Sequence, residues 1–358
     1  MAAKLMIMPS ARTRYVKDEN MKLIYYSLIV VAVFMVLSNF YMYSFMHMIK
    51  QIIMIVLSVW ITRETEILFY TLDKDITRGQ SKELIAKSYY KVTALIYVLL
   101  IPIGTPLWLV VIGAIMATFL GKLMFGGFHH MVFYAPLVGY LFVTLGWTGL
   151  AVNADFVNSF DTYLLRLMFD NEFFNQTLSI GNMFDPYTLT SLELLFEGTP
   201  YKFINVFLGL TPGIVGNGVV LVLVFAFLLF KKAINWILPT VLLASFLMTA
   251  LIIGLVNGQD LMFPLHHVFS GAFLFIMIFA ASDPITTPIP TAGKIVFGVI
   301  AGALAMFIRI GGTYSEGIIF AVLFMSMLTP LLNQELKKKK KDLMPKKNKK
   351  KPVEKAGA

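Results

Sequence analysis

Four charged residues lie in apolar surroundings in this sequence and are its first candidates for chemistry: Lys122, Asp283, Arg309 and Glu316. A charge at membrane depth is energetically expensive, so such residues commonly mark a cofactor, substrate or ion site. A cation could stabilise an anionic ligand, and a carboxylate could accept a proton or bind Na⁺. The alternative interpretation is that each side chain lies at a helix end and reaches the interface, or pairs locally, as Arg309 and Glu316 could.

All four charges flank a repeated sequence element. The hexapeptide PIGTPL at residues 102–107 is matched by PITTPI at residues 284–289, and each leads into a short apolar run that ends at two glycines. The glycine pairs are Gly126-Gly127 and Gly311-Gly312. Glycine allows close approach of a partner helix or a flat ligand, which makes Gly126 and Gly127 candidate cofactor contacts. We interpret the two segments as an internal repeat.

The composition indicates that a bilayer is the solvent of this chain. Of 358 residues, 58% are hydrophobic and 14% are charged, and the mean hydropathy is +0.76. These values argue against an ordinary water-soluble domain. Cysteine is absent from the sequence, which excludes disulfides, thiolate metal sites and a cysteine nucleophile. Redox chemistry would therefore require an organic cofactor.

Ten apolar runs reach or approach the roughly 20 residues that a membrane-spanning helix needs. They lie near residues 23–43, 46–62, 90–104, 106–121, 131–152, 211–230, 236–256, 267–282, 294–309 and 317–332. Several are short and interrupted by Pro or Gly, which is typical of discontinuous helices that line a protein-buried cavity. We therefore predict an all-α polytopic membrane protein of about ten transmembrane helices. The proline elements could also be ordinary interhelical turns.

The distribution of Lys and Arg predicts the topology. Basic residues gather at the N-terminus, in the loop from Lys74 to Lys91, at Lys231-Lys232 and in the C-terminal tail. With ten spans, all four segments lie on the same side of the membrane. The positive-inside rule makes that side cytoplasmic, together with both termini. The connection between spans five and six carries seven acidic residues and one arginine between residues 154 and 201, and is predicted to be external. Five spans on each side of it form two halves of inverted orientation.

This topology divides the chain into five segments. They are a cytoplasmic segment (1–22), a first five-helix half (23–153), an external acidic loop (154–202), a second five-helix half (203–333) and a disordered lysine-rich tail (334–358). Because the tail holds eleven lysines, it accounts for most of the net charge of +10. We expect it to lie on anionic lipid headgroups rather than on nucleic acid.

Two further groups of polar residues are weaker candidates. The adjacent histidines His129-His130 and His266-His267 lack the i, i+4 spacing of a helical metal site, so we expect interfacial histidines and no protein metal centre. In the external loop, Asp185 is followed by the hydroxyl residues Thr188, Thr190 and Ser191. On the residues alone, this is an Asp-initiated turn that leads into a capped helix.

Several of these motifs together resemble a known family of membrane flavoproteins. Arg309 begins an Arg-x-Gly-Gly-x-x-x-Glu-Gly pattern, Lys122 begins Lys-x-x-Phe-Gly-Gly, and Asp283 begins a sequence close to Asp-x-x-Thr-Ser-Pro. In this combination they are similar to the NqrB/RnfD family. The family comprises the D subunit of the Rnf ferredoxin:NAD oxidoreductase and the B subunit of the sodium-pumping NADH:quinone oxidoreductase. The length of the chain is more similar to the Rnf subunit.

The resemblance implies ten helices in two inverted halves and two flavins. Family members carry FMN esterified to a hydroxyl at the last position of an Asp-x-x-(Ser/Thr)-Gly-Ala-Thr motif in the external loop. On this chain the motif begins at Asp185, its first hydroxyl is Thr188, and its acceptor position holds Ser191, with Thr190 as the alternative acceptor. A second, non-covalent flavin, riboflavin or FMN, is implied near the glycine pairs and the broken helices.

The resemblance also implies a function. It indicates a membrane subunit, inactive alone, of a complex that couples electron transfer between the two flavins to translocation of Na⁺ or H⁺. Such a complex lies in the bacterial inner membrane with other membrane and soluble subunits. Lys122 or Arg309 would stabilise an anionic reduced flavin, and Asp283 or Glu316 would accept a proton or bind Na⁺; no residue is assigned as catalytic. The alternatives are a stand-alone channel or secondary transporter, and a flavin-free assembly subunit of the same complex.

Overall fold

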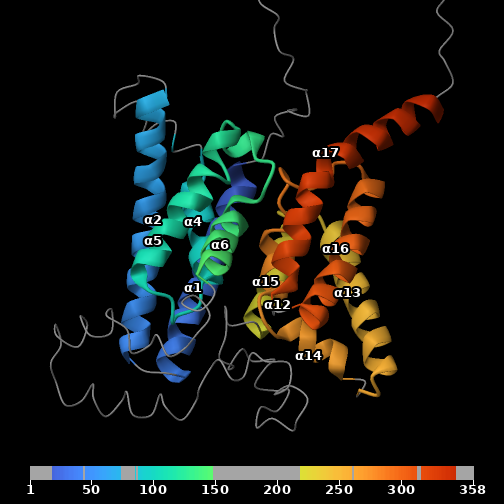
Figure 1. Cartoon of the computed structure of the whole chain (residues 1–358), viewed down its shortest axis with the longest axis horizontal. Coiled ribbons are helices and arrows are strands. Elements are labelled where there is room, and N and C mark those ends of the chain that lie inside the picture. The colour runs from blue at the N-terminus through green and yellow to red at the C-terminus, as the bar shows by residue number, and fades with distance from the viewer. Residues whose placement is uncertain are drawn as a thin grey trace, which may run out of the picture.

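The computed structural model describes residues 18–42, 45–73, 85, 88–147, 218–259, 262–312 and 316–343. Within these ranges every regular element is helical (Figure 1). The first half contains α1 (Asp18–Met42), α2 (Phe45–Asp73), α4 (Tyr90–Leu100), α5 (Leu107–Phe119), the 3₁₀ turns η1 (Leu123–Phe125) and η2 (Phe128–His130), and α6 (Ala135–Gly146). The second half contains α12 (Val219–Phe230), α13 (Ile237–Val256), α14 (Phe263–Phe269), α15 (Phe273–Phe279), α16 (Thr291–Gly311) and α17 (Gly317–Leu343).

The prediction of an all-α polytopic membrane protein is confirmed. Within the described residues, each of the ten predicted spans overlaps a helix, and the eighth overlaps both α14 and α15. Among the described residues, five helices are long and apolar enough to cross a membrane: α1, α2, α5 extended to Phe125, α13 and α16. Four shorter apolar helices accompany them in the same part of the chain. Helix α17 continues to Leu343, through the first lysines of the segment predicted as a tail.

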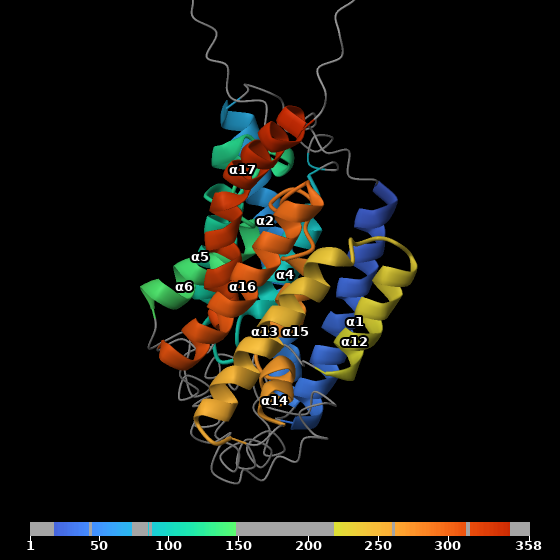
Figure 2. The same cartoon turned by 90° about the vertical axis from the view of Figure 1, so that its right-hand side faces the viewer.

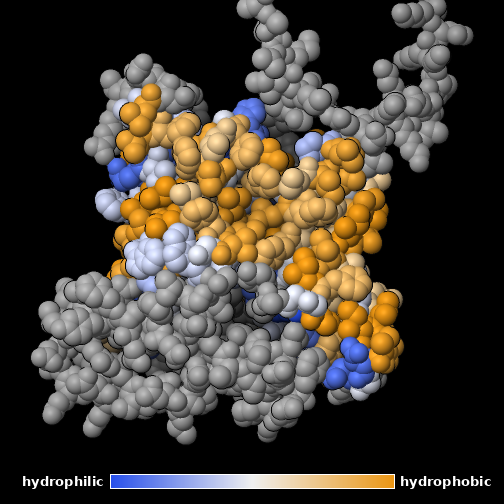
Figure 3. All heavy atoms as spheres, viewed as in Figure 1, coloured by the Kyte–Doolittle hydropathy of each residue, from blue (hydrophilic) through white to orange (hydrophobic). Residues whose placement is uncertain are grey.

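The outer surface of the helices is apolar. Large side chains such as Leu223, Phe230 and Val256 are exposed, and Figure 3 shows apolar residues as a broad band across the middle of the face in view. A contiguous apolar surface of this kind drives association in water, whereas in a bilayer it faces hydrocarbon. The chain is therefore a multi-pass membrane protein.

Two short helices form the core of the two halves. Helix α4 has 11 residues and α15 has seven, and the residues from Val92 to Leu100 and all of α15 are buried. At 1.5 Å per residue neither helix spans the roughly 30 Å hydrocarbon core. The proline elements separate them from the next helices, because α5 begins after Pro106 and α16 after Pro290. A helix-free proline segment thus follows the short buried helix at both copies of the repeat, which fits a helix break and also an ordinary turn between two helices.

The helices of the two halves pack in the same pattern and in opposite orientation. Helix α5 packs on α2 and α6, and correspondingly α16 packs on α13 and α17. Helix α4 contacts α1, α2 and α6, as α15 contacts α12, α13 and α17. In Figure 1, α2 runs upward while its counterpart α13 runs downward to α14.

Equivalent helices meet where the halves join. Helix α1 contacts α12, which Figure 2 shows side by side, and α6 contacts α17. The hydroxyl of Tyr134, before α6, donates to the carbonyl of Phe279 at the end of α15 (3.1 Å). An interface between equivalent elements is what two-fold pseudosymmetry produces.

Candidate functional site

Lys122 lies in a fully buried charge cluster in the first half. Its Nζ is 2.6 Å from Oε1 of Glu66 on α2, and both side chains have an exposed fraction of 0%. The same Nζ donates to the backbone carbonyl of Ser88 (2.5 Å) and lies 5.5 Å from the ring centroid of Phe128. The lysine therefore neutralises a buried carboxylate and binds the turn that precedes α4.

Arg309 and Glu316 bind the break between α14 and α15 in the second half. The Arg309 guanidinium donates from Nη1 to the carbonyl of His267 (2.6 Å) and from Nη2 to that of Ser270 (2.7 Å). Glu316 Oε2 accepts from the backbone N–H of Ala272, the N-cap of α15 (2.8 Å). The end of a helix has unsatisfied carbonyls with partial negative charge, and the start of a helix has unsatisfied N–H groups with partial positive charge. Arg309 therefore binds the end of α14, and Glu316 binds the start of α15.

The chain between these two contacts passes through a left-handed glycine. Gly271 has φ +68°, and a Cβ atom there would overlap with both the Arg309 guanidinium and the Glu316 carboxylate. The two charged groups therefore close on the backbone of the turn from both sides, and their opposite charges also attract each other.

The two clusters are equivalent features of the repeat. In each half, a cation that precedes the double glycine binds a carbonyl at the turn before a short buried helix. In the first half that turn contains Tyr89 with φ +52°. Glu66 lies in the last turns of α2, whose C-terminal end is uppermost in Figure 1, whereas α14 lies at the lower end. The inverted repeat thus places the clusters toward opposite ends of the molecule.

Asp283 organises the second proline element. Its Oδ2 accepts hydrogen bonds from the N–H of Ile285 (3.0 Å) and from the N–H and hydroxyl of Thr286 (2.8 and 2.9 Å). The carbonyl of Thr286 in turn accepts from Thr329 on α17 (2.9 Å). The carboxylate therefore satisfies N–H groups that the prolines prevent from forming a helix.

The two glycine pairs differ in conformation. Gly126 and Gly127 have φ values of +98° and +99°, where other residues are strained. Gly311 ends α16, and Gly312 is extended with φ −102°. The first pair is therefore required by a turn between η1 and η2, where Gly127 faces the hydroxyl of Tyr70 on α2.

The histidine pairs occupy different surroundings. His129 and His130 are exposed, whereas His267 is almost fully buried. Desolvation, followed by the charges of His130 and Lys122, lowers the pKa of His129 below its ordinary value. Within the part of the chain that the structure describes, no three acidic or histidine side chains are grouped as they are around a metal ion.

The sequence reasoning missed Glu66 because the second span was predicted to end at residue 62, before Arg63 and Glu64. Helix α2 continues to Asp73, and its buried face carries Ser58, Thr62 and Glu66 at four-residue intervals. This i, i+4 spacing of polar residues within an apolar helix was the signal that could have identified it. The predicted attachment residues Asp185, Thr188, Thr190 and Ser191 lie outside the described residues.

The fold and the buried charges define a class of protein. It is a polytopic membrane protein made of two inverted helical repeats, in which buried charged side chains bind the backbone where helices are interrupted. The sequence model of the NQR2, RnfD, RnfE family matches residues 10–341. The chain therefore belongs to that family.

Curated relatives agree with this assignment. The D subunit of the ion-translocating oxidoreductase complex of Mannheimia succiniciproducens is 29% identical over 304 residues, covering 77% of this chain and 79% of the relative. The protein of the same name from Actinobacillus succinogenes is 31% identical over 261 residues, covering 68% and 74%. That from Haemophilus influenzae is 28% identical over 273 residues, covering 67% and 74%.

Proposed function

We propose that this chain is the D-type membrane subunit of an ion-translocating electron transport complex. In this proposal it passes electrons between a covalently bound FMN and a second, non-covalent flavin while the complex moves Na⁺ or H⁺. The observation that carries the proposal is the family match over residues 10–341, together with relatives named as subunits of an ion-translocating oxidoreductase complex.

The proposed covalent site is in the segment between the two halves. We propose a phosphoester between FMN and the hydroxyl of Ser191, or of Thr190, within the motif that begins with Asp185 and Thr188. A bound flavin supplies the electron-accepting and electron-donating chemistry, and the protein positions it. This segment lies outside the described residues, so the proposal rests on the motif.

The charged residues of the helix breaks already have protein partners. The charged atoms of Lys122, Arg309 and Glu316 bind backbone groups or Glu66, and all of these side chains are buried. We therefore assign them first to holding the half-helices, and a direct contact with a flavin stays a prediction. Their fixed charges would still set the electrostatic potential in which a flavin or an ion moves.

The proposed second flavin, riboflavin or FMN, lies beside the Gly126-Gly127 turn. Gly126 is exposed, and the ring of Phe125 next to it lies 5.9 Å from that of Phe133. Glycine backbone and aromatic faces together suit a flat ring system. Lys122 is in the adjacent turn, with its side chain directed to Glu66 rather than to this surface.

We further propose that the chain is inactive alone, and that it lies in the bacterial inner membrane with both termini cytoplasmic. The placement of basic segments on one side of ten spans supports this orientation. Its partners would be the other membrane and soluble subunits of the complex.

Co-purification combined with an absorption spectrum tests the function. The expected result is a yellow protein that co-purifies with redox subunits from the native membrane. A colourless protein that still co-purifies with them would instead indicate an assembly subunit. A colourless protein that purifies alone and transports solutes into liposomes would replace the proposal with a stand-alone transporter.

A further inference from the structure

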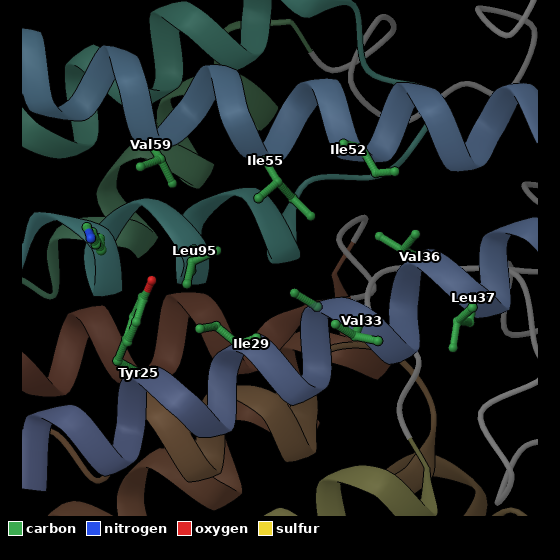
Figure 4. Close-up of a pocket in the computed structure, with 11 residues that line it drawn as sticks. Tyr25, Ile29, Val33, Val36, Leu37, Ile52, Ile55, Val59 and Leu95 are labelled. Atoms are coloured by element: carbon green, nitrogen blue, oxygen red, sulfur yellow. The ribbon is translucent and has the colours of Figure 1, made fainter.

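An apolar groove runs along the outside of the first half, between α1 and α2. Figure 4 shows its two walls, with Tyr25 at one end and Leu37 at the other. The walls are Ile29, Val33 and Val36 of α1 and Ile52, Ile55 and Val59 of α2. Leu95 of α4 also lines the groove. The lining contains almost no polar surface apart from the two side chains at one end, Tyr25 and Lys91.

The dimensions of the groove match a single lipid chain. Twelve residues separate Tyr25 from Leu37 on α1, which is a length of about 18 Å at 1.5 Å per residue. One leaflet of the hydrocarbon core is about 15 Å deep. The volume of the groove is about 530 Å³.

The polar end of the groove carries a positive charge. Lys91, the second residue of α4, is exposed, and its Nζ lies 5.8 Å from the ring centroid of Tyr25. Within the described ranges no carboxylate forms an ion pair with Lys91. The first carboxylate of α1, Asp18, accepts a hydrogen bond from the hydroxyl of Tyr89. Lys91 lies in the first turn of α4 and Tyr25 in the third turn of α1, so both mark the N-terminal end of the groove.

We propose that this groove binds one acyl chain of an anionic phospholipid, with the lipid phosphate at Lys91 and the hydroxyl of Tyr25. The apolar walls hold the chain, and Lys91 selects for a net negative headgroup. The site lies in the first half alone, so the proposal stands independently of whether the chain carries flavins.

Native mass spectrometry of the full-length protein in detergent tests the proposal. The probes are phosphatidylglycerol and phosphatidylcholine with identical acyl chains, each titrated onto delipidated protein. Val33→Trp fills the groove, and Val30→Trp is its matched control, because both valines are on α1 and 54% exposed but only Val33 lines the groove. Lys91→Gln removes the charge at an exposed position, where a substitution should change stability by less than about 0.5 kcal/mol.

The expected result is one tightly held phosphatidylglycerol per chain, bound at least tenfold more weakly after Val33→Trp and unchanged after Val30→Trp. Lys91→Gln should weaken the binding of phosphatidylglycerol about fivefold and leave the binding of phosphatidylcholine unchanged. Equal binding of the two lipids by the unmodified protein would overturn the proposal, as would equal effects of the two Trp substitutions. Loss of another subunit from the native complex on Val33→Trp, without loss of lipid, would overturn it in favour of a protein partner.

Discussion

Removing the positive charge of Lys122 should strongly destabilise the first half. The Nζ–Oε1 distance to Glu66 is 2.6 Å and neither side chain is exposed, so Lys122→Met leaves a carboxylate buried without compensation. Breaking a buried pair on one side costs about 3–5 kcal/mol. Glu66→Met should cost a similar amount, about 3–5 kcal/mol, because it leaves the lysine charge unpaired. In the double variant no charge remains, and the chief loss is the donor to the Ser88 carbonyl, about 1–3 kcal/mol.

The assay is a double-mutant cycle on the free energy of unfolding, measured by SDS titration in mixed micelles. The double variant should be at least about 3 kcal/mol more stable than the sum of the two single losses predicts. Lys22→Met, at an exposed lysine of α1, is the control and should change stability by less than about 0.5 kcal/mol. Additive losses in the double variant would refute the argument that each charge is present in the core to compensate the other.

Two further predictions concern the break between α14 and α15. Gly271→Ala should destabilise the protein by clearly more than Gly258→Ala in the same unfolding assay. Both glycines have φ near +68°, but only at Gly271 would side chains overlap with a Cβ atom. Equal effects would show that Arg309 and Glu316 can move aside at no cost in stability. Arg309→Lys keeps the charge but lacks the planar guanidinium that donates to two carbonyls at once. The free energy of unfolding should therefore fall by about 1.5–3 kcal/mol. If the Arg309→Lys variant unfolded at the same SDS midpoint as the unmodified protein, this prediction would be contradicted.

The sequence was sufficient to predict the helices and the interruptions at the two proline elements. Runs of apolar residues set the ten spans, and the prolines at 102, 106, 284 and 288 marked the ends of α4 and α15, because proline removes a donor and restricts its neighbour. The break between α14 and α15 was not predicted. It occurs at Gly271, which carries no special signal in the sequence and becomes necessary only because two charged side chains from α16 and the start of α17 approach it.

The candidate charges were predicted to lie at membrane depth or to reach the interface from a helix end; all four are buried, and their partners were not predicted. Lys122 and Arg309 bind backbone carbonyls that are distant in sequence by 34 and 39 residues or more, and such contacts follow from packing rather than from local pattern. Pairing of Arg309 with Glu316 was considered, yet the stronger role of each is to satisfy one side of the same helix break. Glu66 was not included in the second predicted span, because the neighbouring charges Arg63 and Glu64 ended the apolar run before it.

Intact-mass spectrometry tests the central claim most directly. The chain, purified with its partner subunits from a host that contains the flavin transferase, should carry the added mass of one esterified FMN. Ser191→Ala should abolish the addition, and Thr190→Ala should leave it in place; the reverse pattern would assign the acceptor to Thr190. An unmodified mass for the unaltered chain in that host would contradict the proposal that this subunit carries a covalent flavin.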